Sequence, residues 1–335
     1  MSWRPWGPVG NMNTEVLSID PHAPDAALIE RAAGLIRGGR LVAFPTETVY
    51  GLGANALDAA AVRAIFAAKG RPPSNPVIVH VSEPAQVRNV ASDWPETATK
   101  LAAAFWPGPL TLVVPKSPTV PDEVTAGGPT VAVRCPNHPV ARVLIAAAGV
   151  PVAAPSANRS TELSPTLGDH VLKGMNGRID LVLDGGPCPG GIESTVVDVT
   201  GPVARLLRPG LVTVAMLEAV VGALAVGAGS DSIARSPGLM AKHYSPRTPV
   251  VLADDADAEN QQLRDAGLRV ISVGPDLVYD SRSIPDDPAG YAAVLYAVLH
   301  ELDDGRFDRI VVAMPPDTPE WAAVRDRLTR AAAPG

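Results

Sequence analysis

The chain has 335 residues, a length that favours two domains over one. Hydrophobic residues make up 46% and charged residues 19% of it, so the composition predicts a buried core and argues against disorder as the main state. Two cysteines, Cys135 and Cys188, are too few for a disulfide framework or a four-ligand zinc site. A reducing compartment, the cytoplasm, is the expected location.

The net charge of −7 is unevenly distributed. Residues 250–335 contain 8 basic and 16 acidic residues, whereas residues 1–249 contain 20 and 19. Because binding to the phosphate backbone relies on clustered Lys and Arg, strong direct nucleic-acid binding is not expected. The first residues lack the apolar run of a secretory signal, and Glu218 and several glycines interrupt the apolar stretch 211–229, so no membrane segment is expected.

Helices and strands alternate along the first two-thirds of the chain. Apolar residues at helical spacing predict a helix over 25–38, followed by a buried strand over 41–44. Asp58 is a good N-cap for the next helix, and Gly70 is suited to ending it. Further strands are expected over 77–81, 110–114, 131–135, 150–154, 181–184, 195–199 and 205–207, with helices over 138–148 and 164–173. Ser164-Pro165 resembles the start of the last helix. This order predicts an α/β sheet with helices on both faces.

Residues 230–249 contain three prolines and show no periodicity, which predicts a linker. Beyond it, strands over 250–253, 269–273 and 309–313 alternate with helices over 257–266, 291–302 and 321–331. This pattern predicts a small Rossmann-like domain over 250–335, after a main domain over 14–229. The domain lacks Gly-x-Gly-x-x-Gly after its first strand, so no dinucleotide is assigned to it.

Residues 45–53, with the sequence Pro-Thr-Glu-Thr-Val-Tyr-Gly-Leu-Gly, place polar groups and two glycines after a strand. Loops at strand ends are common ligand sites, and Gly51 and Gly53 would let the backbone approach a ligand closely. A glycine-rich turn with capping threonines explains the stretch equally well.

The pair Lys69 and Arg71 flanks Gly70 at the expected end of a helix. A point charge beside a planar guanidinium suits a polyphosphate. Compensation of the helix dipole, at about 0.3–1 kcal/mol, would explain Lys69 alone. It does not explain the rigid prolines that follow at 72, 73 and 76.

His80 and Arg134 stand on apolar strands. Alternation places Ile78 and His80 on one face of their strand and Val77, Val79 and Val81 on the other. Taken alone, His80 is more often a core histidine than a catalytic group. A charge at the position of Arg134 is rarely unpaired. It could contact a substrate carboxylate, or Asp122 or Glu123.

Other polar groups recur at strand ends, in residues 154–158, 164–166, 193–195 and 208–210. Ordinary capping explains each one singly, but not their number in one domain. The sequence contains no His-x-x-x-His pair, no Gly-x-x-x-x-Gly-Lys-Ser/Thr loop and no Gly-x-Ser-x-Gly elbow. Phosphate handling therefore requires a different scaffold, and no protein-held metal is expected.

Eight short motifs occur in a familiar order: Pro-Thr-Glu-Thr-Val-Tyr-Gly-Leu-Gly, Lys-Gly-Arg-Pro, Asn-Pro-Val-Ile-Val-His-Val, Trp-Pro-Gly-Pro-Leu-Thr, Val-Ala-Val-Arg-Cys-Pro, Pro-Ser-Ala-Asn, Glu-Ser-Thr-Val-Val-Asp and Leu-Arg-Pro-Gly. Together they resemble the YrdC-type threonylcarbamoyl-AMP synthases, over roughly residues 25–210. Ser-Pro-Gly followed by His-Tyr-Ser-Pro, and then a small domain, resembles the two-domain form of that family.

The resemblance implies a twisted mixed sheet flanked by helices, and a linker that closes over the site as a lid. It also implies an activity, in which L-threonine, bicarbonate or carbon dioxide, and ATP give threonylcarbamoyl-AMP and pyrophosphate. The product would feed a tRNA-threonylcarbamoyl transferase machinery. Mg²⁺ would arrive bound to ATP, which fits the lack of a protein metal cage.

The resemblance also implies site residues. Threonine contacts are expected from Thr48, His80, Arg134, the backbone of Ala154, and Ser194. ATP contacts are expected from Lys69, Arg71, Asn75, Thr130, Ser156, Ser164, Arg208 and Tyr244. Lys69 and Arg71 are the expected catalytic pair, acting by positioning and charge neutralisation.

One departure from the family pattern lies in the linker. The family usually has a tyrosine and two basic residues between Ser-Pro-Gly and His-Tyr, but here the stretch is Leu239-Met-Ala-Lys242. If the linker is a lid, looser closure over the site is therefore expected around Ala241. Two other functions fit parts of the pattern: an RNA-binding module without ATP turnover, and a carbamoyl-phosphate-dependent transferase. The charge distribution argues against the first, and the two cysteines and the chain length argue against the second.

Overall fold

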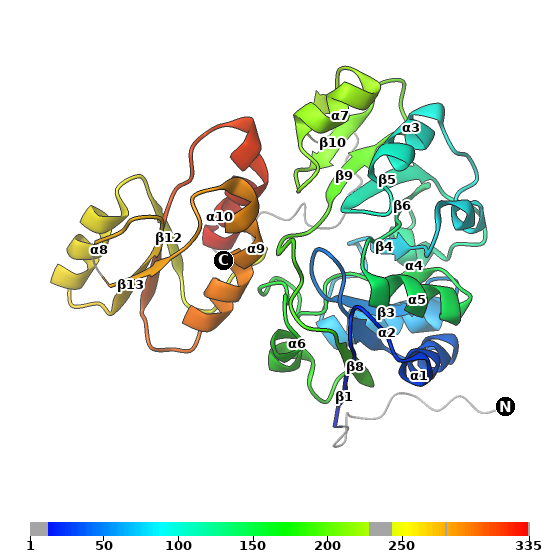
Figure 1. Cartoon of the computed structure of the whole chain (residues 1–335), viewed down its shortest axis with the longest axis horizontal. Coiled ribbons are helices and arrows are strands. Elements are labelled where there is room, and N and C mark those ends of the chain that lie inside the picture. Colours follow the sequence, from blue (N-terminus) through cyan, green and yellow to red (C-terminus); the bar gives the residue numbers. More distant parts are fainter. Residues whose placement is uncertain (1–12, 228–242, 279, 334–335) are drawn as a thin grey trace.

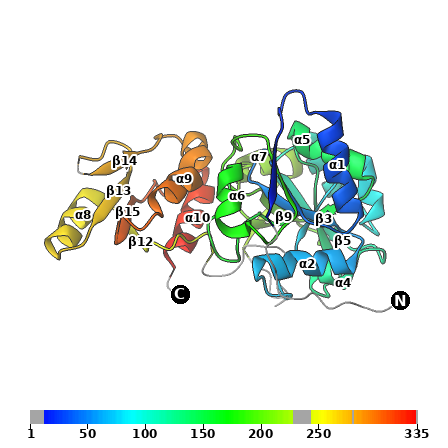
Figure 2. The same cartoon turned by 90° about the horizontal axis from the view of Figure 1, so that it is seen from below.

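The computed structural model describes residues 13–227, 243–278 and 280–333, which form two α/β units (Figure 1). The N-terminal unit (13–227) and the C-terminal unit (243–333) are each built on their own sheet. They lie side by side in both views (Figures 1 and 2).

The sheet of the N-terminal unit is mixed. Within the described residues its strands follow the order β1-β8-β2-β3-β7-β4-β6-β5-β9-β10-β11. Their bounds are β1 Glu15–Ser18, β2 Val42–Phe44, β3 Gly51–Asn55, β4 Ile78–His80, β5 Leu110–Pro115, β6 Thr130–Arg134, β7 Val152–Ala153, β8 Leu181–Asp184, β9 Thr195–Asp198, β10 Arg205–Arg208 and β11 Ala225–Val226. Parallel and antiparallel pairs alternate irregularly, which confirms the predicted mixed sheet.

Helices cover both faces of this sheet. Their bounds are α1 Ala26–Arg37, α2 Ala59–Lys69, α3 Glu96–Phe105, α4 Asp122–Thr125, α5 Pro139–Ala148, α6 Gly168–Met175 and α7 Val214–Val221, with a short 3-10 helix, η1, at Pro84–Asn89. On one face, α1 and α5 share a core with Val42 and Phe44 of β2. On the other face, α2, α3 and α7 pack over the larger core of the unit.

Local signals set the helix ends that the sequence predicts. The Asp25 side chain accepts hydrogen bonds from two backbone N–H groups at the start of α1, and Asp58 does the same for α2. Gly70 ends α2 in the left-handed region, at φ 64°. Both predicted helices are confirmed to within a residue or two.

Residues 45–53 are only partly the predicted ligand loop: residues 45–50 form a loop that lines a pocket, whereas the rest belongs to a strand. The second half forms β3, which pairs antiparallel with β2 and β7. A Cβ on Gly53 would lie 2.6 Å from the Phe44 ring. Gly53 is therefore needed for packing within the sheet, and the prediction that it serves close approach of a ligand is wrong.

The helix predicted to start at Ser164-Pro165 begins later. Leu167 is its N-cap residue and α6 starts at Gly168. The Ser164 hydroxyl donates to the Glu193 carboxylate 29 residues away, so this serine does not cap the helix. Its tertiary partner overrides the local signal.

The C-terminal unit has a parallel sheet in the order β12-β15-β13-β14. Its elements are β12 Val250–Ala253, α8 Ala256–Asp265, β13 Val270–Gly274, β14 Ser281–Ser283, α9 Pro288–Leu302, β15 Arg309–Ala313, a 3-10 turn η2 at Pro319–Trp321, and α10 Ala322–Ala332. Apolar residues of α8 pack on one face of the sheet, and those of α9 and α10 pack on the other. The predicted small Rossmann-like arrangement is confirmed.

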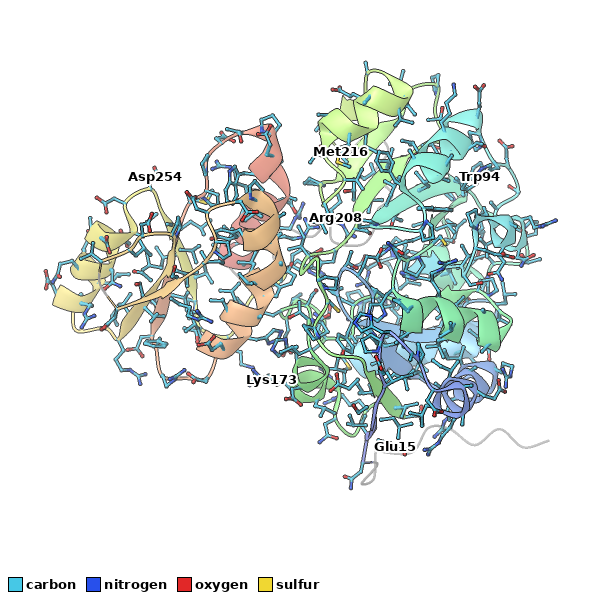
Figure 3. All side chains as sticks on the ribbon, in the orientation of Figure 1. Glu15, Trp94, Lys173, Arg208, Met216 and Asp254 are labelled. Carbon is cyan, nitrogen blue, oxygen red and sulfur yellow. The ribbon has the colours of Figure 1, made fainter. Side chains whose placement is uncertain are left out.

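Helices α9 and α10 lie between the small sheet and the N-terminal unit (Figures 1 and 2). Val49, Leu163 and Ile192 of the N-terminal unit belong to the same apolar core as these helices. Lys173 on α6 donates to the carbonyl oxygen of His300 at 2.9 Å (Figure 3). The two units therefore share a packed interface.

The predicted linker over 230–249 is only partly described. Residues 230–242, including the altered stretch Leu239–Lys242, lie outside the described residues. Within the part of the chain that the structure describes, no helix is long and apolar enough to cross a membrane.

Candidate active site

One row of side chains crosses five neighbouring strands of the large sheet. His80 on β4 pairs with Arg134 on β6, and Arg134 pairs with Thr111 on β5. Thr111 pairs with Val196 on β9, which pairs with Arg208 on β10. Directly paired residues point to the same face, so this register gathers two arginines, a histidine and a threonine on one face.

Loops from other parts of the unit surround this row and form a pocket. Its lining residues are Thr46, Thr48, Val49, Gly51, Arg71, Ile78, His80, Arg134, Ala154, Pro155, Ser156, Glu193, Ser194, Arg208, His243 and Tyr244. Its enclosed volume is about 50 Å³, which is room for a few water-sized groups. A nucleotide would therefore have to extend beyond it or displace part of its wall.

Arg134 is buried and faces Glu47. Its Nη2 atom lies 2.8 Å from Oε1 of Glu47, and Nε donates to the Gly108 carbonyl. The predicted protein partners Asp122 and Glu123 pair instead with Lys116 and Arg63, so that expectation is wrong. Although the two side chains form an ion pair, neither carboxylate oxygen of Glu47 has a hydrogen-bond partner among the described residues. The pair thus leaves capacity for a further polar group.

His80 is buried beside Arg134. Burial and then the charge of Arg134 lower the pKa of His80 to about 3. Its Nδ1 atom has no hydrogen-bond partner among the described residues. A neutral imidazole can donate or accept a hydrogen bond here, but it is poorly suited to take up a proton as a general base.

Arg208 holds Ser194 and reaches Tyr244. Its Nε donates to the Ser194 carbonyl at 3.1 Å and its Nη2 to the Ser194 hydroxyl at 3.2 Å. Its Nη1 donates to the Tyr244 hydroxyl at 3.4 Å. The Ser194 hydroxyl also lies 2.8 Å from that of Thr111. Ser194 is therefore fixed by an arginine and a threonine, and no described residue is bonded to its hydroxyl as a base that could activate it as a nucleophile.

Tyr244 brings the described end of the linker region into the site. Its backbone lies in the left-handed region, at φ 60°, which is uncommon for a residue other than glycine. The guanidinium of Arg327 on α10 lies over its ring, 5.3 Å from the centroid. The C-terminal unit thus holds one wall of the pocket in place.

The Lys69 ammonium group faces backbone carbonyls, whereas a phosphate contact requires it to face the pocket. Its side chain is 1% exposed, and Nζ donates to the carbonyls of Ser156 at 2.6 Å and Asn158 at 2.5 Å. Burial and then the neighbouring Arg71 keep the pKa of Lys69 well below its usual value. Lys69 is not among the residues that line the pocket. In this structure it positions the segment 156–158.

Arg71 lines the pocket and is anchored by its own loop. Nε donates to the Asn75 carbonyl and Nη2 to the Pro76 carbonyl. Burial lowers the pKa of Arg71 to about 10, so it remains a cation near neutral pH. The rigid prolines after Gly70 therefore shape a loop that aims this guanidinium.

Glu193 connects the pocket with the C-terminal unit. It accepts from Ser164, from Tyr296 on α9 at 3.2 Å, and from Arg327 on α10 at 2.7 Å. Burial raises the pKa of Glu193, but Arg327 and Arg208 outweigh it and hold the pKa below its usual value. Glu193 is therefore an ionised, fully partnered carboxylate.

The structure brings most of the predicted site residues together. Those that line the pocket are Thr48, Arg71, His80, Arg134, Ala154, Ser156, Ser194, Arg208 and Tyr244. Four others do not line it: Lys69, Asn75, Thr130 and Ser164. Asn75 contributes the carbonyl that anchors Arg71, and Thr130 lies at the opposite end of β6 from Arg134.

Several lining residues were not predicted as contacts. Glu193 and Thr46 stand in motifs that the sequence singled out, but His243 precedes the assigned tyrosine and was given no role. Thr111 ends the Trp-Pro-Gly-Pro-Leu-Thr motif and does not line the pocket, but sheet register brings it into the row. Strand alternation would have placed Thr111 on one face of β5, but not opposite Arg134.

The pocket is lined by three arginines and by neutral hydroxyl groups. The Glu193 carboxylate in its lining already accepts hydrogen bonds from Ser164, Tyr296 and Arg327. This arrangement suits a ligand with anionic groups and favours binding and orientation over covalent catalysis. Among the described residues there is no group of three or more His, Cys, Asp or Glu side chains that could hold a metal ion. These features define a two-unit α/β protein with a buried, arginine-lined pocket at the junction.

Comparison with known proteins assigns both units. A family profile described as "Telomere recombination" matches residues 34–210, and one described as "Threonylcarbamoyl-AMP synthase, C-terminal domain" matches residues 212–333. The chain is 41% identical to the threonylcarbamoyl-AMP synthase of Bacillus subtilis, over 91% of this chain and 92% of the relative. It is 42% identical to that of Pyrococcus abyssi, over 90% and 93%.

A solved structure agrees with this assignment. The crystal structure of P. abyssi Sua5 complexed with L-threonine superimposes with a TM-score of 0.91 at 39% identity, covering 95% of this chain and 98% of that one. A variant of the same protein, with a histidine and the following tyrosine replaced by alanine, gives a TM-score of 0.89. The chain belongs to the threonylcarbamoyl-AMP synthase family, in its two-domain form.

Proposed function

We propose that the protein condenses L-threonine, bicarbonate or carbon dioxide, and ATP into threonylcarbamoyl-AMP, with release of pyrophosphate. The observation that carries this proposal is the identity of 41–42% to threonylcarbamoyl-AMP synthases over nine-tenths of the chain. The row of His80, Arg134 and Arg208 supplies the charge and shape that such substrates need.

The threonine end of the site is formed by Thr48, His80, Arg134, the Ala154 backbone and Ser194. Arg134 has a guanidinium that can bind a carboxylate with two hydrogen bonds. The enclosed volume of about 50 Å³ suits a small amino acid better than a nucleotide. His80 lines this end of the pocket as a neutral imidazole, which can pair with a hydroxyl or an amine.

The ATP end is formed by Arg71, Ser156, Arg208 and Tyr244, with Lys69, Asn75, Thr130 and Ser164 around it. Arg71 and Arg208 face the pocket as cations and can bind phosphate oxygens directly. Lys69 and Asn75 act through their partners: Lys69 holds the Ser156 carbonyl, and the Asn75 carbonyl anchors Arg71. Ser164 also acts through a partner, because its hydroxyl donates to Glu193, which lines the pocket.

The chemistry requires no protein nucleophile. The threonine amine adds to carbon dioxide and loses a proton to give a carbamate. A carbamate oxygen attacks the α-phosphorus of ATP, and the bond from that phosphorus to the bridging oxygen breaks to release pyrophosphate. The protein orients the two reactants and neutralises the charge that develops. Mg²⁺ carried by ATP would neutralise phosphate charge in addition, since the described residues provide no cage of their own.

We assign residues 14–229 to the catalytic domain, 230–249 to a linker that acts as a lid, and 250–335 to the C-terminal domain. Tyr244 supports the lid assignment because it lines the pocket while Arg327 contacts its ring. A tRNA-threonylcarbamoyl transferase would consume the product. We expect the reaction to take place in the cytoplasm, where ATP and tRNA are both available.

The proposal is tested by measuring pyrophosphate release from ATP with the purified full chain. Release is expected to require both threonine and bicarbonate, and to fall sharply when serine or valine replaces threonine. Equal release without threonine would contradict the proposal. Salt-sensitive RNA binding without any ATP turnover would instead support the RNA-binding alternative.

A further inference from the structure

Helix α10 lies on the side of the C-terminal unit that faces the N-terminal unit (Figures 1 and 2) and carries a buried arginine, Arg327. Within the described residues, only His243 and Tyr244 of the C-terminal unit line the pocket, and both precede β12. Arg327 does not line the pocket, yet it contacts three segments that do. Its contacts therefore connect the body of the C-terminal unit with the candidate active site.

The first contact is with the segment that carries Ser194. Nε of Arg327 donates to Oε2 of Glu193 at 2.7 Å, and Nη2 donates to the carbonyl oxygen of the same residue at 3.3 Å. Glu193 directly precedes Ser194 in the chain. Because Arg327 holds Glu193 through both its side chain and its backbone, it fixes the position from which Ser194 enters the pocket.

The second contact is with the segment that carries Arg208. Nη2 of Arg327 also donates to the carbonyl oxygen of Pro209, at 3.1 Å, and Pro209 directly follows Arg208. A Cβ on Gly210 would lie 2.4 Å from the backbone nitrogen of Thr195, so the two segments are in close contact here. One nitrogen of Arg327 therefore bridges the backbone beside Ser194 and the backbone beside Arg208.

The third contact is with Tyr244. The Arg327 guanidinium lies over the Tyr244 ring, 5.3 Å from its centroid, while the Tyr244 hydroxyl accepts from Nη1 of Arg208 at 3.4 Å. The tyrosine is thus held between two guanidinium groups. A displacement of Arg327 would reach both the ring and its contact with Arg208.

The Arg327 guanidinium is itself held in one orientation. Its remaining nitrogen, Nη1, donates to the carboxylate of the neighbouring Asp326 at 2.6 Å. All three nitrogens are therefore engaged, in the fixed directions that a planar guanidinium imposes. A lysine ammonium could keep the charge opposite Glu193, but it could not reproduce these directions.

Helix α9 also contacts the segment before Ser194. The Tyr296 hydroxyl donates to Oε2 of Glu193 at 3.2 Å. Gly191 has a positive φ of 72°, and a Cβ there would lie 2.1 Å from the Ala292 carbonyl oxygen. These contacts of α9 act on the segment before Ser194, whereas those of Arg327 act on all three segments.

We propose, on the basis of the function proposed above, that Arg327 is a positioning residue of the active site. Its guanidinium holds Ser194, Arg208 and Tyr244 in the arrangement that binds threonine and ATP, and it touches neither substrate. The C-terminal unit is then part of the binding machinery through the body of helix α10, in addition to any closure by the linker.

Arg327→Lys tests this proposal in steady-state assays of pyrophosphate release with the full chain. The variant keeps the buried positive charge but loses the fork that reaches the Glu193 and Pro209 carbonyls. We expect kcat/KM for threonine to fall about tenfold to a hundredfold, as for the loss of hydrogen bonds to a charged group. The KM values for threonine and ATP should both rise, because both ends of the site lose their alignment. Unchanged KM values would overturn the proposal.

Two controls separate positioning from stability. Arg325→Lys makes the same substitution on the same helix, where Arg325 pairs with the exposed Asp317. Val311→Ala lowers stability in the core between the small sheet and α8, away from the junction. Both should keep the KM values of the unaltered chain at a temperature where thermal unfolding shows each variant to be folded. An equal rise in either control would overturn the proposal.

If Arg327→Lys fails to fold, the double variant Glu193→Gln/Arg327→Met takes its place, because it removes both buried charges. Its KM for threonine should exceed that of Glu193→Gln alone, since only the double variant loses the contacts to the two backbone carbonyls. Equal KM values in these two variants would assign Arg327 a structural role and overturn the proposal.

Threonine binding separates this proposal from the proposed function. If the unaltered chain released no pyrophosphate, the proposed function itself would fail. Calorimetric titration with threonine alone would then still test Arg327, because binding requires no turnover. Arg327→Lys should bind threonine more weakly than Arg325→Lys does. Equal affinity of these two variants, or no threonine binding by the unaltered chain, would overturn the positioning role.

Discussion

At the scale of single residues, burial changes what a side chain can do. Lys69 and Arg71 stand two positions apart and look equivalent in the sequence. The structure surrounds the Lys69 ammonium with backbone carbonyls, whereas Arg71 lines the pocket. The left-handed backbone at Gly70 turns the chain between them, so the Lys69 and Arg71 side chains point in different directions. Similar cations therefore have different surroundings: Lys69 supports a loop, and Arg71 faces the pocket.

Replacing Lys69 by methionine tests this distinction. The variant keeps the apolar stem but leaves the Ser156 and Asn158 carbonyls without their donor, at about 1–3 kcal/mol for each buried group. We expect both a lower melting temperature and a loss of turnover. Lys100→Met, on an exposed surface pair, should change neither. An unchanged melting temperature with abolished turnover would show that Lys69 contacts ATP instead.

At the scale of elements, local signals predict helices well and sheet contacts poorly. Asp58 and Gly70 define both ends of α2 through groups within a few residues, so this helix could be predicted. β3 was missed because Gly51 and Gly53 resemble a turn, and only pairing with β2 and β7 makes them a strand. The start of α6 was misplaced because Ser164 bonds to the distant Glu193.

The site follows the same rule. Motif resemblance identified Arg134 and Arg208, but their alignment with His80 depends on the register of four strand pairs. Glu47 as the partner of Arg134 could not be predicted, because a turn brings it there from another strand end. Arg327, 134 residues from Glu193, lies in a different unit altogether.

Helix α10 carries the most buried charge at the junction. Arg327 is 0% exposed and pairs with Glu193, so Arg327→Met leaves a carboxylate in the interface without its main counter-charge. We expect a loss of about 3–5 kcal/mol in stability, as for other broken buried pairs. A lower midpoint in thermal or urea unfolding would measure it.

A second substitution separates charge from packing. Glu193→Gln combined with Arg327→Met removes the buried charge and should recover part of the lost stability. Arg282→Met, which breaks only an exposed pair with Glu301, should cost little. If the double variant were as unstable as Arg327→Met alone, the loss would come from packing and not from the unpaired carboxylate.

At the scale of the whole molecule, the two units meet through buried, neutral histidines as well as apolar residues. His170 on α6 and His300 on α9 stack with centroids 3.9 Å apart. Burial lowers the pKa of His170 to about 4 and that of His300 to about 3. The junction is therefore built to exclude the charged forms of both rings.

This arrangement makes stability depend on pH. The unfolded chain binds more protons than the folded chain between the usual histidine pKa, near 6.5, and the lowered values of about 4 and 3. The stability that the neutral rings contribute is fully present above pH 6.5 and is lost as the pH falls through this window. Melting temperatures measured from pH 7.5 to 4.5 should decrease.

His170→Phe keeps a stacked ring but removes one titrating group, so its melting temperature should fall less steeply with decreasing pH. The exposed His22→Phe should leave the slope unchanged. Parallel curves for His170→Phe and the unaltered chain would mean that His170 does not contribute to the acid sensitivity.

The central claim is that the junction site joins a carbamate of threonine to AMP. Mass spectrometry of the reaction with isotope-labelled bicarbonate tests it most directly. The account predicts an adenylate whose mass contains threonine, AMP and the labelled carbon, formed only when ATP, threonine and bicarbonate are all present. An unlabelled threonyl adenylate, or AMP and pyrophosphate without this adduct, would contradict it.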